Sequence, residues 1–231
     1  MRKTTLTLTS TLGGACLLLG AGAPSAFAAA PTGPLVDQSV AVLRSVGADP
    51  KLAGQLSRAR GVLIIPRYGQ GGLIVGARGG EGLILVRSRE HWSDPAFYKV
   101  RSVTLGAQIG AQGGSVALLL MSQKAIDDVM GGNNFSIDAN AGLSVAKASA
   151  QTQAAVAGAP DAILWSNVKG AYAGANIGVS DVAQDRATDR AFYHRDVAVS
   201  DILTGRVRTA GGSALAKTLD RVAGRHMAAA S

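Results

Sequence analysis

Apolar residues recur at helical spacing near both ends of the chain. Between Leu35 and Val46 they stand three or four positions apart, which predicts an amphipathic helix that Gly47 ends. Two roles are open for its apolar side, namely packing on a sheet and lying on a bilayer. Spacing and capping residues predict further helices at 49–59, 123–130, 197–203 and 213–225.

Between these helices the pattern changes to short apolar runs separated by glycine. The runs at 61–65, 72–77 and 83–86 predict strands, with Pro66 closing the first and residues 78–82 forming a turn. Glycine inside a strand marks a close backbone approach, a bulge or a bend. We therefore expect an α+β fold, a single domain with a strongly curved, mostly antiparallel Gly-rich β-sheet and flanking helices at the N- and C-termini. The remaining strands are expected at 103–111, 115–121, 135–145, 162–168 and 171–179.

The first 28 residues have the three parts of a secretory signal peptide. Arg2 and Lys3 precede an apolar stretch, and small residues at the −3 and −1 positions predict cleavage after Ala28. A flexible lead is then expected at 29–33 and the domain at 34–231. The alternative is a retained membrane anchor, which the Thr, Ser and Gly residues in the apolar stretch disfavour.

Composition narrows the chemistry of an exported chain. Cys16 is the one cysteine and lies in the predicted signal peptide, so the mature domain would have no disulfide and no catalytic thiol; acylation of Cys16 is the alternative. The 231 residues carry a net charge of +8, and removal of the signal peptide leaves +6. This excess attracts anionic surfaces, and outside the cytoplasm we expect phospholipid rather than nucleic acid.

Familiar catalytic motifs do not occur in the sequence. It lacks the Gly-x-Ser-x-Gly elbow, the phosphate-binding Gly-x-x-x-x-Gly-Lys and His-Glu-x-x-His, and its glycine clusters lie between predicted strands, which favours hairpin turns. His91, His194 and His226 are far apart, so a metal site or a triad would need distant convergence. Aspartate and arginine alternate at 185–196, which predicts an exposed salt-bridged segment. We expect no enzymatic activity, no cofactor and no metal.

Seven stretches together resemble the SYLF domain family. The resemblance implies a non-catalytic lipid-binding domain, because eukaryotic members bind phosphoinositides, some associate with actin at membranes, and bacterial members are small exported proteins. The family's cation before the Gly-Gly of the second strand is missing, and the nearest cation is Arg67. In order and spacing, the matching stretches are Gly61–Pro66, Gly71–Gly76, Gly82–Val86, Trp92–Tyr98, Gly106–Gln112, Leu119–Ala125 and Lys169–Gly174.

Cations and aromatic residues make up the candidate lipid site. A cation near an anionic surface contributes about 1 kcal/mol, and aromatic side chains suit the interface. The alternatives are solvated strand ends for the cations and core packing for the aromatics. The residues are Arg58, Arg60, Arg67, Arg78, Lys99, Arg101 and Lys169, with Trp92, Phe97 and Tyr98.

These observations predict an exported, non-enzymatic domain that recognises anionic phospholipids. We expect it in the periplasm or outside the cell, possessing affinity for a membrane surface. One alternative is a structural or protein-interaction domain of the cell envelope with an envelope protein as partner. The other is an uncharacterised hydrolase with residues from distant loops.

Overall fold

The computed structural model describes residues 32–229, except for 73–74, 89–90, 106–108, 132–134, 138–142, 148–159 and 174–178. Residues 1–31 lie outside the described part. Cleavage after Ala28, acylation of Cys16 and the part of the lead at 29–31 therefore stay predictions, whereas Thr32 and Gly33, the last two residues of the expected lead, are helical. The side chains of Arg78 and Lys169 also lie outside it, although their backbones are described.

Six helices are described, and local capping explains where several begin. Asp49 accepts the backbone N–H of Lys51 at 3.0 Å, and Ser122 accepts that of Ala125 at 3.1 Å. Four of the five helices predicted from spacing lie within three residues of the expected ends, and α6 extends a few residues further. The helices are α1 (Thr32–Gly47), α2 (Pro50–Arg58), α3 (Gln123–Met130), α4 (Arg186–Tyr193), α5 (Val199–Leu203) and α6 (Ala210–Ala229).

The described strands form one open, mostly antiparallel sheet, which confirms the predicted α+β class. Its order is β6-β10-β4-β2-β1-β5-β8-β7, with β3 beside β2 and β9 beside β5. The pair β7–β8 is parallel. The strands are β1 (Gly61–Gly72), β2 (Val75–Ser88), β3 (His91–Trp92), β4 (Ala96–Leu105), β5 (Ile109–Leu120), β6 (Phe135–Ile137), β7 (Leu143–Lys147), β8 (Ala162–Ser166), β9 (Lys169–Ala173) and β10 (Val179–Gln184).

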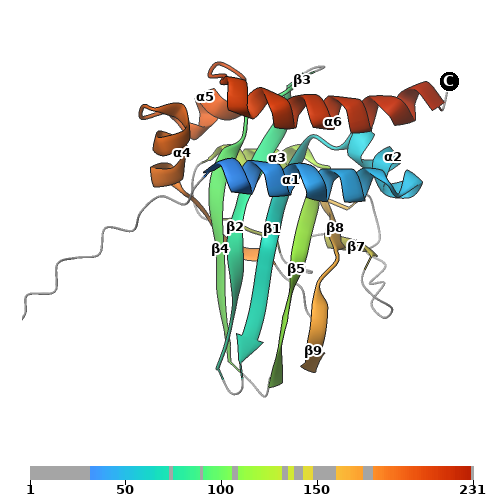
Figure 1. Ribbon diagram of the computed structural model, residues 1–231, viewed down its shortest axis with the longest axis vertical. Helices are drawn as coiled ribbons and strands as arrows, with labels where there is room; N and C mark the ends of the chain where they lie inside the picture. The colour runs from blue at the N-terminus through green and yellow to red at the C-terminus, as the bar shows by residue number, and fades with distance from the viewer. Residues whose placement is uncertain are drawn as a thin grey trace, which may run out of the picture.

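Helices cover one half of the sheet and leave the other half bare of described helices. Figure 1 shows α1 and α6 crossing the upper part of the strands, with α2 beside their right-hand ends, while β1, β2, β4 and β5 continue below them. Beneath α1 and α6 lies one apolar core, which includes Leu43 and Leu219. A second core fills the opposite face, where Val129 of α3 and Ile202 of α5 pack on the sheet. Since Leu43 and Val46 are fully buried, α1 packs on the sheet rather than presenting its apolar side outward.

The prediction of short strands separated by glycine turns was wrong. Residues 78–82 lie inside β2, Gly113 and Gly114 lie inside β5, and β1 continues past Pro66 to Gly72. The register of β1 shifts between Ile64 and Arg67 against β2, so Pro66 occupies a bulge, where a missing N–H is tolerated. The strands β1, β2 and β5, of 12, 14 and 12 residues, are therefore long central strands of the sheet.

Close contact between strands explains part of the glycine content. A Cβ on Gly79 would lie 2.2 Å from the carbonyl oxygen of Val100 in β4, and one on Gly80 would lie 2.3 Å from that of Arg67 in β1. These positions confirm the expected close approach. Gly69 differs, because nothing lies within 4 Å of a Cβ built there. Contact with the neighbouring strand therefore requires glycine at positions 79 and 80, whereas at position 69 there is room for a larger side chain.

Candidate functional site

The three aromatic candidates lie in the core. Trp92, Phe97 and Tyr98 are each 1% exposed. The ring of Phe97 meets that of Phe192 edge-on at 5.1 Å between centroids, and the hydroxyl of Tyr98 donates to the carbonyl of Val129 at 3.3 Å. This is the core-packing alternative, and side chains so placed do not reach a membrane surface.

The segment Trp92–Tyr98 also anchors the C-terminal helix. Asp94 is fully buried, and its carboxylate accepts the backbone N–H of Thr209 and the Thr209 hydroxyl at 3.2 Å, at the start of α6. Burial raises the pKa of Asp94, against the hydrogen bonds from Thr209. Gly212 leaves room for this carboxylate, since a Cβ there would come 2.4 Å from it. Asp94 is thus a helix cap supplied from a distant segment.

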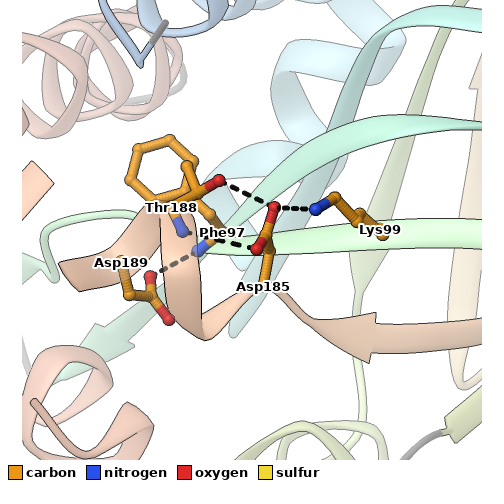
Figure 2. A network of polar contacts seen from close by, with 5 residues as sticks. All are labelled: Phe97, Lys99, Asp185, Thr188 and Asp189. Carbon is orange, nitrogen blue, oxygen red and sulfur yellow. Dashed lines mark hydrogen bonds and ion pairs between the residues drawn. The ribbon is translucent and has the colours of Figure 1, made fainter. Parts of the chain in front are cut away.

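A polar network ties α4 to the edge of β4 (Figure 2). Lys99 Nζ lies 2.6 Å from Asp185 Oδ2, and the hydroxyl of Thr188 donates to the same oxygen at 2.7 Å. Burial opposes the charge of Asp185, but the hydrogen bonds from Lys99 and Thr188 outweigh it and lower its pKa. Lys99 is therefore partly neutralised within the fold.

Asp189 of α4 is a buried acid beside this network. It accepts the backbone N–H of Phe97 at 2.9 Å and the side-chain amide of Gln184 at 2.7 Å. Burial raises the pKa of Asp189 to about 6, against these two hydrogen bonds. The prediction of an exposed salt-bridged segment at 185–196 was thus wrong for its first two aspartates, and it holds for the pair Arg190–Asp196, 2.6 Å apart.

The sheet register brings several predicted cations to one face. Arg67 pairs with Glu81, which pairs with Lys99, and Gly79 pairs with Arg101. Directly opposite residues point to the same face of an antiparallel sheet. We call this set the lower sheet face. Its described members are Arg67, Gly69, Gly79, Glu81, Lys99, Arg101 and Gly113.

Glycines separate the cations of the lower sheet face. Gly69 lies between Gly113 of β5 and Gly79 of β2, and Arg101 follows Gly79 in the same row. On the other side of this row, Lys169 of β9 pairs with Gly113. Arg67, Gly69, Arg101 and Gly113 are exposed. The face therefore has a row of glycines with Arg67 and Arg101 beside it, and a shallow hollow of about 390 Å³ lies next to Arg67 and Gly113. Arg78 pairs with Ser102 and Gln70, one position out of this row, so its register position belongs to the opposite face.

Arg58 and Arg60 lie elsewhere, at the end of the sheet under α2. With Arg87 of β2 they line a hollow of about 360 Å³. Arg87 was missed from the sequence, because only the pairing of Gly61 with Val86 brings it beside Arg60. The predicted cations therefore form two separate groups instead of one site, and the register position of Arg78 belongs to neither group.

Metal sites, membrane-spanning helices and catalytic histidines have little support in the described part of the chain. Its His, Cys, Asp and Glu side chains form no group of three that could hold a metal ion. Among the described helices, none combines the length and apolar character that crossing a bilayer requires. His91 and His194, the histidines considered for a hydrolase, are both exposed.

These features define a single α+β domain whose buried acids serve the fold. Its exposed candidate arginines lie in two places, Arg67 and Arg101 on the lower sheet face and Arg58 and Arg60 beside the hollow. The chain belongs to the Ysc84 family: the family model described as "Las17-binding protein actin regulator" matches residues 101–222. This confirms the resemblance to the SYLF domain. Family members are named as binding or regulatory proteins, which fits a domain without enzymatic activity.

Curated relatives extend the similarity beyond this match. SH3 domain-containing YSC84-like protein 1 of Bos taurus is 26% identical over 169 residues, covering 71% of this chain and 49% of the relative. LAS seventeen-binding protein 3 of Saccharomyces cerevisiae is 29% identical over 161 residues, covering 66% of this chain and 34% of the relative. The chain thus spans half or less of the length of these relatives. No solved structure matches it.

Proposed function

We propose that this chain is a non-catalytic domain that attaches to membranes through anionic phospholipids. The observation that supports this proposal is the lower sheet face, where Arg67 and Arg101 are exposed and Lys99 keeps 27% of its side-chain surface. Glu81 is the one acid among its described members. The face therefore carries net positive charge on an open surface.

Exposed arginines beside a row of glycines suit contact with a membrane surface. Glycines at 69, 79 and 113 leave the backbone without side chains between Arg67 and Arg101, so both guanidinium groups can approach one plane. At about 1 kcal/mol for each cation, the pair supplies about 2 kcal/mol, and Lys99 adds less because Asp185 holds it. Attachment through this face alone is weak, reversible and sensitive to salt.

The place of action belongs to the same proposal. The N-terminal pattern that ends at Ala28 supports export, and the domain would then act in the periplasm or outside the cell. General anionic phospholipids are the ligands that such a location offers. Mass spectrometry of the mature N-terminus tests this part, and an intact Met1 would contradict it.

Co-sedimentation with vesicles tests the lipid proposal. Neutral phosphatidylcholine vesicles are compared with vesicles that contain phosphatidylglycerol, at low and at high salt. The double variant R67Q/R101Q should bind the anionic vesicles about 30-fold more weakly, which corresponds to about 2 kcal/mol. The variant R190Q/R206Q removes the same charge from exposed, ion-paired arginines and should bind nearly as well as the unmodified chain. Equal binding to neutral and anionic vesicles contradicts the electrostatic mechanism, and absence of binding to both contradicts the proposal.

A protein-interaction role is the second candidate, and the comparisons favour it. Relatives carry names that refer to binding of Las17, a protein partner. In this chain the corresponding role would be a structural or protein-interaction domain of the cell envelope. A pull-down that recovers a stoichiometric protein partner without lipid, undiminished for R67Q/R101Q, would support this role over the lipid one.

A further inference from the structure

Three arginines from separate elements converge at the end of the sheet under α2. Arg58 ends α2, Arg60 precedes β1, and Arg87 lies near the end of β2. With the buried Ala59 they line the hollow of about 360 Å³ described above. Arg60 and Arg67 are seven residues apart on or beside β1, about 20 Å along an extended strand, so this hollow is separate from the lower sheet face.

Arg60 and Arg87 form a like-charged pair across two strands. The backbone N–H of Arg87 donates to the carbonyl of Arg60 at 2.7 Å, which continues the pairing of Gly61 with Val86. Residues so placed have their Cβ atoms about 5 Å apart, and like charges there are destabilising. In the described part of the chain, the ion pairs within 4 Å all involve cations other than Arg58, Arg60 and Arg87. The fold thus holds these positive charges together without a carboxylate against them.

Neutral groups fix two of the three guanidinium groups. Arg87 Nη1 donates to the carbonyl of Ser57 at 2.5 Å, and Arg60 Nη1 donates to Gln123 Oε1 at 3.0 Å. The amide of Gln123 donates in turn to Asp127 at 2.9 Å, so this carboxylate acts on Arg60 only through an intervening side chain. Each guanidinium carries five N–H donors, and one contact leaves most of them available to a ligand. The side chains of Arg60 and Arg87 are therefore oriented before a ligand arrives, which reduces the entropy lost on binding.

A structural role accounts for only part of this arrangement. Cations near the C-terminus of α2 complement its dipole, which explains Arg58 and the contact of Arg87 with Ser57. It does not explain Arg60, whose guanidinium contacts Gln123 of α3. We propose that Arg58, Arg60 and Arg87 bind a phosphate monoester as its dianion. Planar guanidinium forks match phosphoryl oxygens in pairs, and three positive charges favour a dianion over a singly charged diester.

The phosphate monoester can come from a soluble metabolite or from a lipid headgroup, and two arms of one experiment separate these sources. In the soluble arm, calorimetry measures binding of glycerol 3-phosphate to the full chain, with dimethyl phosphate as the singly charged comparison. In the vesicle arm, phosphatidic acid is compared with phosphatidylglycerol at equal surface charge. Saturable binding in the soluble arm assigns a soluble ester, and a preference for phosphatidic acid alone assigns a headgroup.

Three variants test the residues. R60Q should weaken monoester binding about tenfold or more, since a charged hydrogen-bonded contact is lost. R87K keeps the charge but loses the fork and should weaken binding similarly. R195Q removes an exposed arginine that follows α4 and should change it less than twofold. Thermal unfolding of each variant checks that the fold persists, and binding is compared only among folded variants.

Three results would overturn this assignment: no preference for the monoester in either arm, an equal loss in R195Q, or full binding by R87K. The outcome for the monoester site is independent of the outcome for membrane attachment through the lower sheet face. Salt-dependent binding to phosphatidylglycerol that R67Q/R101Q weakens and R60Q does not would retain the lower sheet face while the monoester site is rejected. The converse pattern would retain the monoester site and reject the lower sheet face.

Discussion

Replacing Asp189 with asparagine should remove one contribution to the pH dependence of the unfolding free energy. Its side chain is 1% exposed and accepts the backbone N–H of Phe97 at 2.9 Å. Burial raises its pKa in the folded state to about 6, from an ordinary value of 3.8. Because the folded state binds this proton more tightly than the unfolded chain, the stabilisation is complete below about pH 4 and is lost as the pH rises through about 6.

The size of the effect follows from the two pKa values. A difference of about two pKa units corresponds to about 3 kcal/mol between pH 4 and pH 7. The variant D189N keeps an oxygen for the N–H of Phe97 and carries no charge at any of these pH values. The unfolding free energy of D189N minus that of the unmodified chain should therefore rise by up to about 3 kcal/mol over this range. Asp94 and Asp185 also contribute to the pH profile, but they are present in both proteins and their contributions largely cancel.

Urea unfolding at pH 4, 5, 6 and 7, followed by circular dichroism, measures this difference. The control is D128N, which removes an exposed carboxylate of α3 that pairs with Lys124 at 2.9 Å. Its profile should follow that of the unmodified chain across the range. Parallel curves for D189N and the unmodified chain from pH 4 to pH 7 would refute the reasoning, because they would show that burial does not hold the proton on Asp189.

Three further substitutions test the packing, by urea unfolding and by hydrogen exchange. Gly79→Ala should lower the unfolding free energy by about 1–3 kcal/mol, because the added Cβ would lie 2.2 Å from the carbonyl oxygen of Val100. Gly69→Ala should leave the unfolding free energy unchanged or raise it slightly, because nothing lies within 4 Å of a Cβ at that position. Equal effects of the two substitutions would contradict the difference in strand contact. Asp94→Ala should cost about 1–2 kcal/mol and speed hydrogen exchange in the first turn of α6, because Thr209 loses its cap. Unchanged exchange there would refute that role for Asp94.

Local signals in the sequence identified most helices, and distant contacts caused the main errors. Asp49 and Ser122 mark the starts of α2 and α3, because a cap acts on residues two or three positions away. Helix α4 was missed because Asp185 and Asp189 resemble surface charges. The group that donates to Asp189 belongs to Phe97, 92 residues earlier in the chain, and spacing within one segment does not reveal such a contact.

The glycines show the same limit of local patterns. Gly79 and Gly80 were interpreted as a turn, whereas neighbouring strands require them, and those neighbours become known only with the sheet order. For the candidate site, Arg58, Arg60, Arg67 and Arg101 are exposed, but their division between two places on the surface depends on strand register. Arg87 is an example, because its position beside Arg60 follows only from the pairing of Gly61 with Val86 in neighbouring strands.

The position of α1 and α6 has a consequence for the order in which the chain can fold. These helices come from opposite ends of the described chain, lie side by side over the same face of the sheet (Figure 1), and share a core in which Leu43 and Leu219 are fully buried. A Cβ on Gly47 would come 2.4 Å from the side chain of Val222, so α6 passes close to the end of α1. This core cannot close until the last element has been synthesised, and contacts of such long sequence separation form slowly. During synthesis the nascent chain therefore exposes the apolar side of α1 until α6 is available to cover it, and exposed apolar surface of this kind favours aggregation.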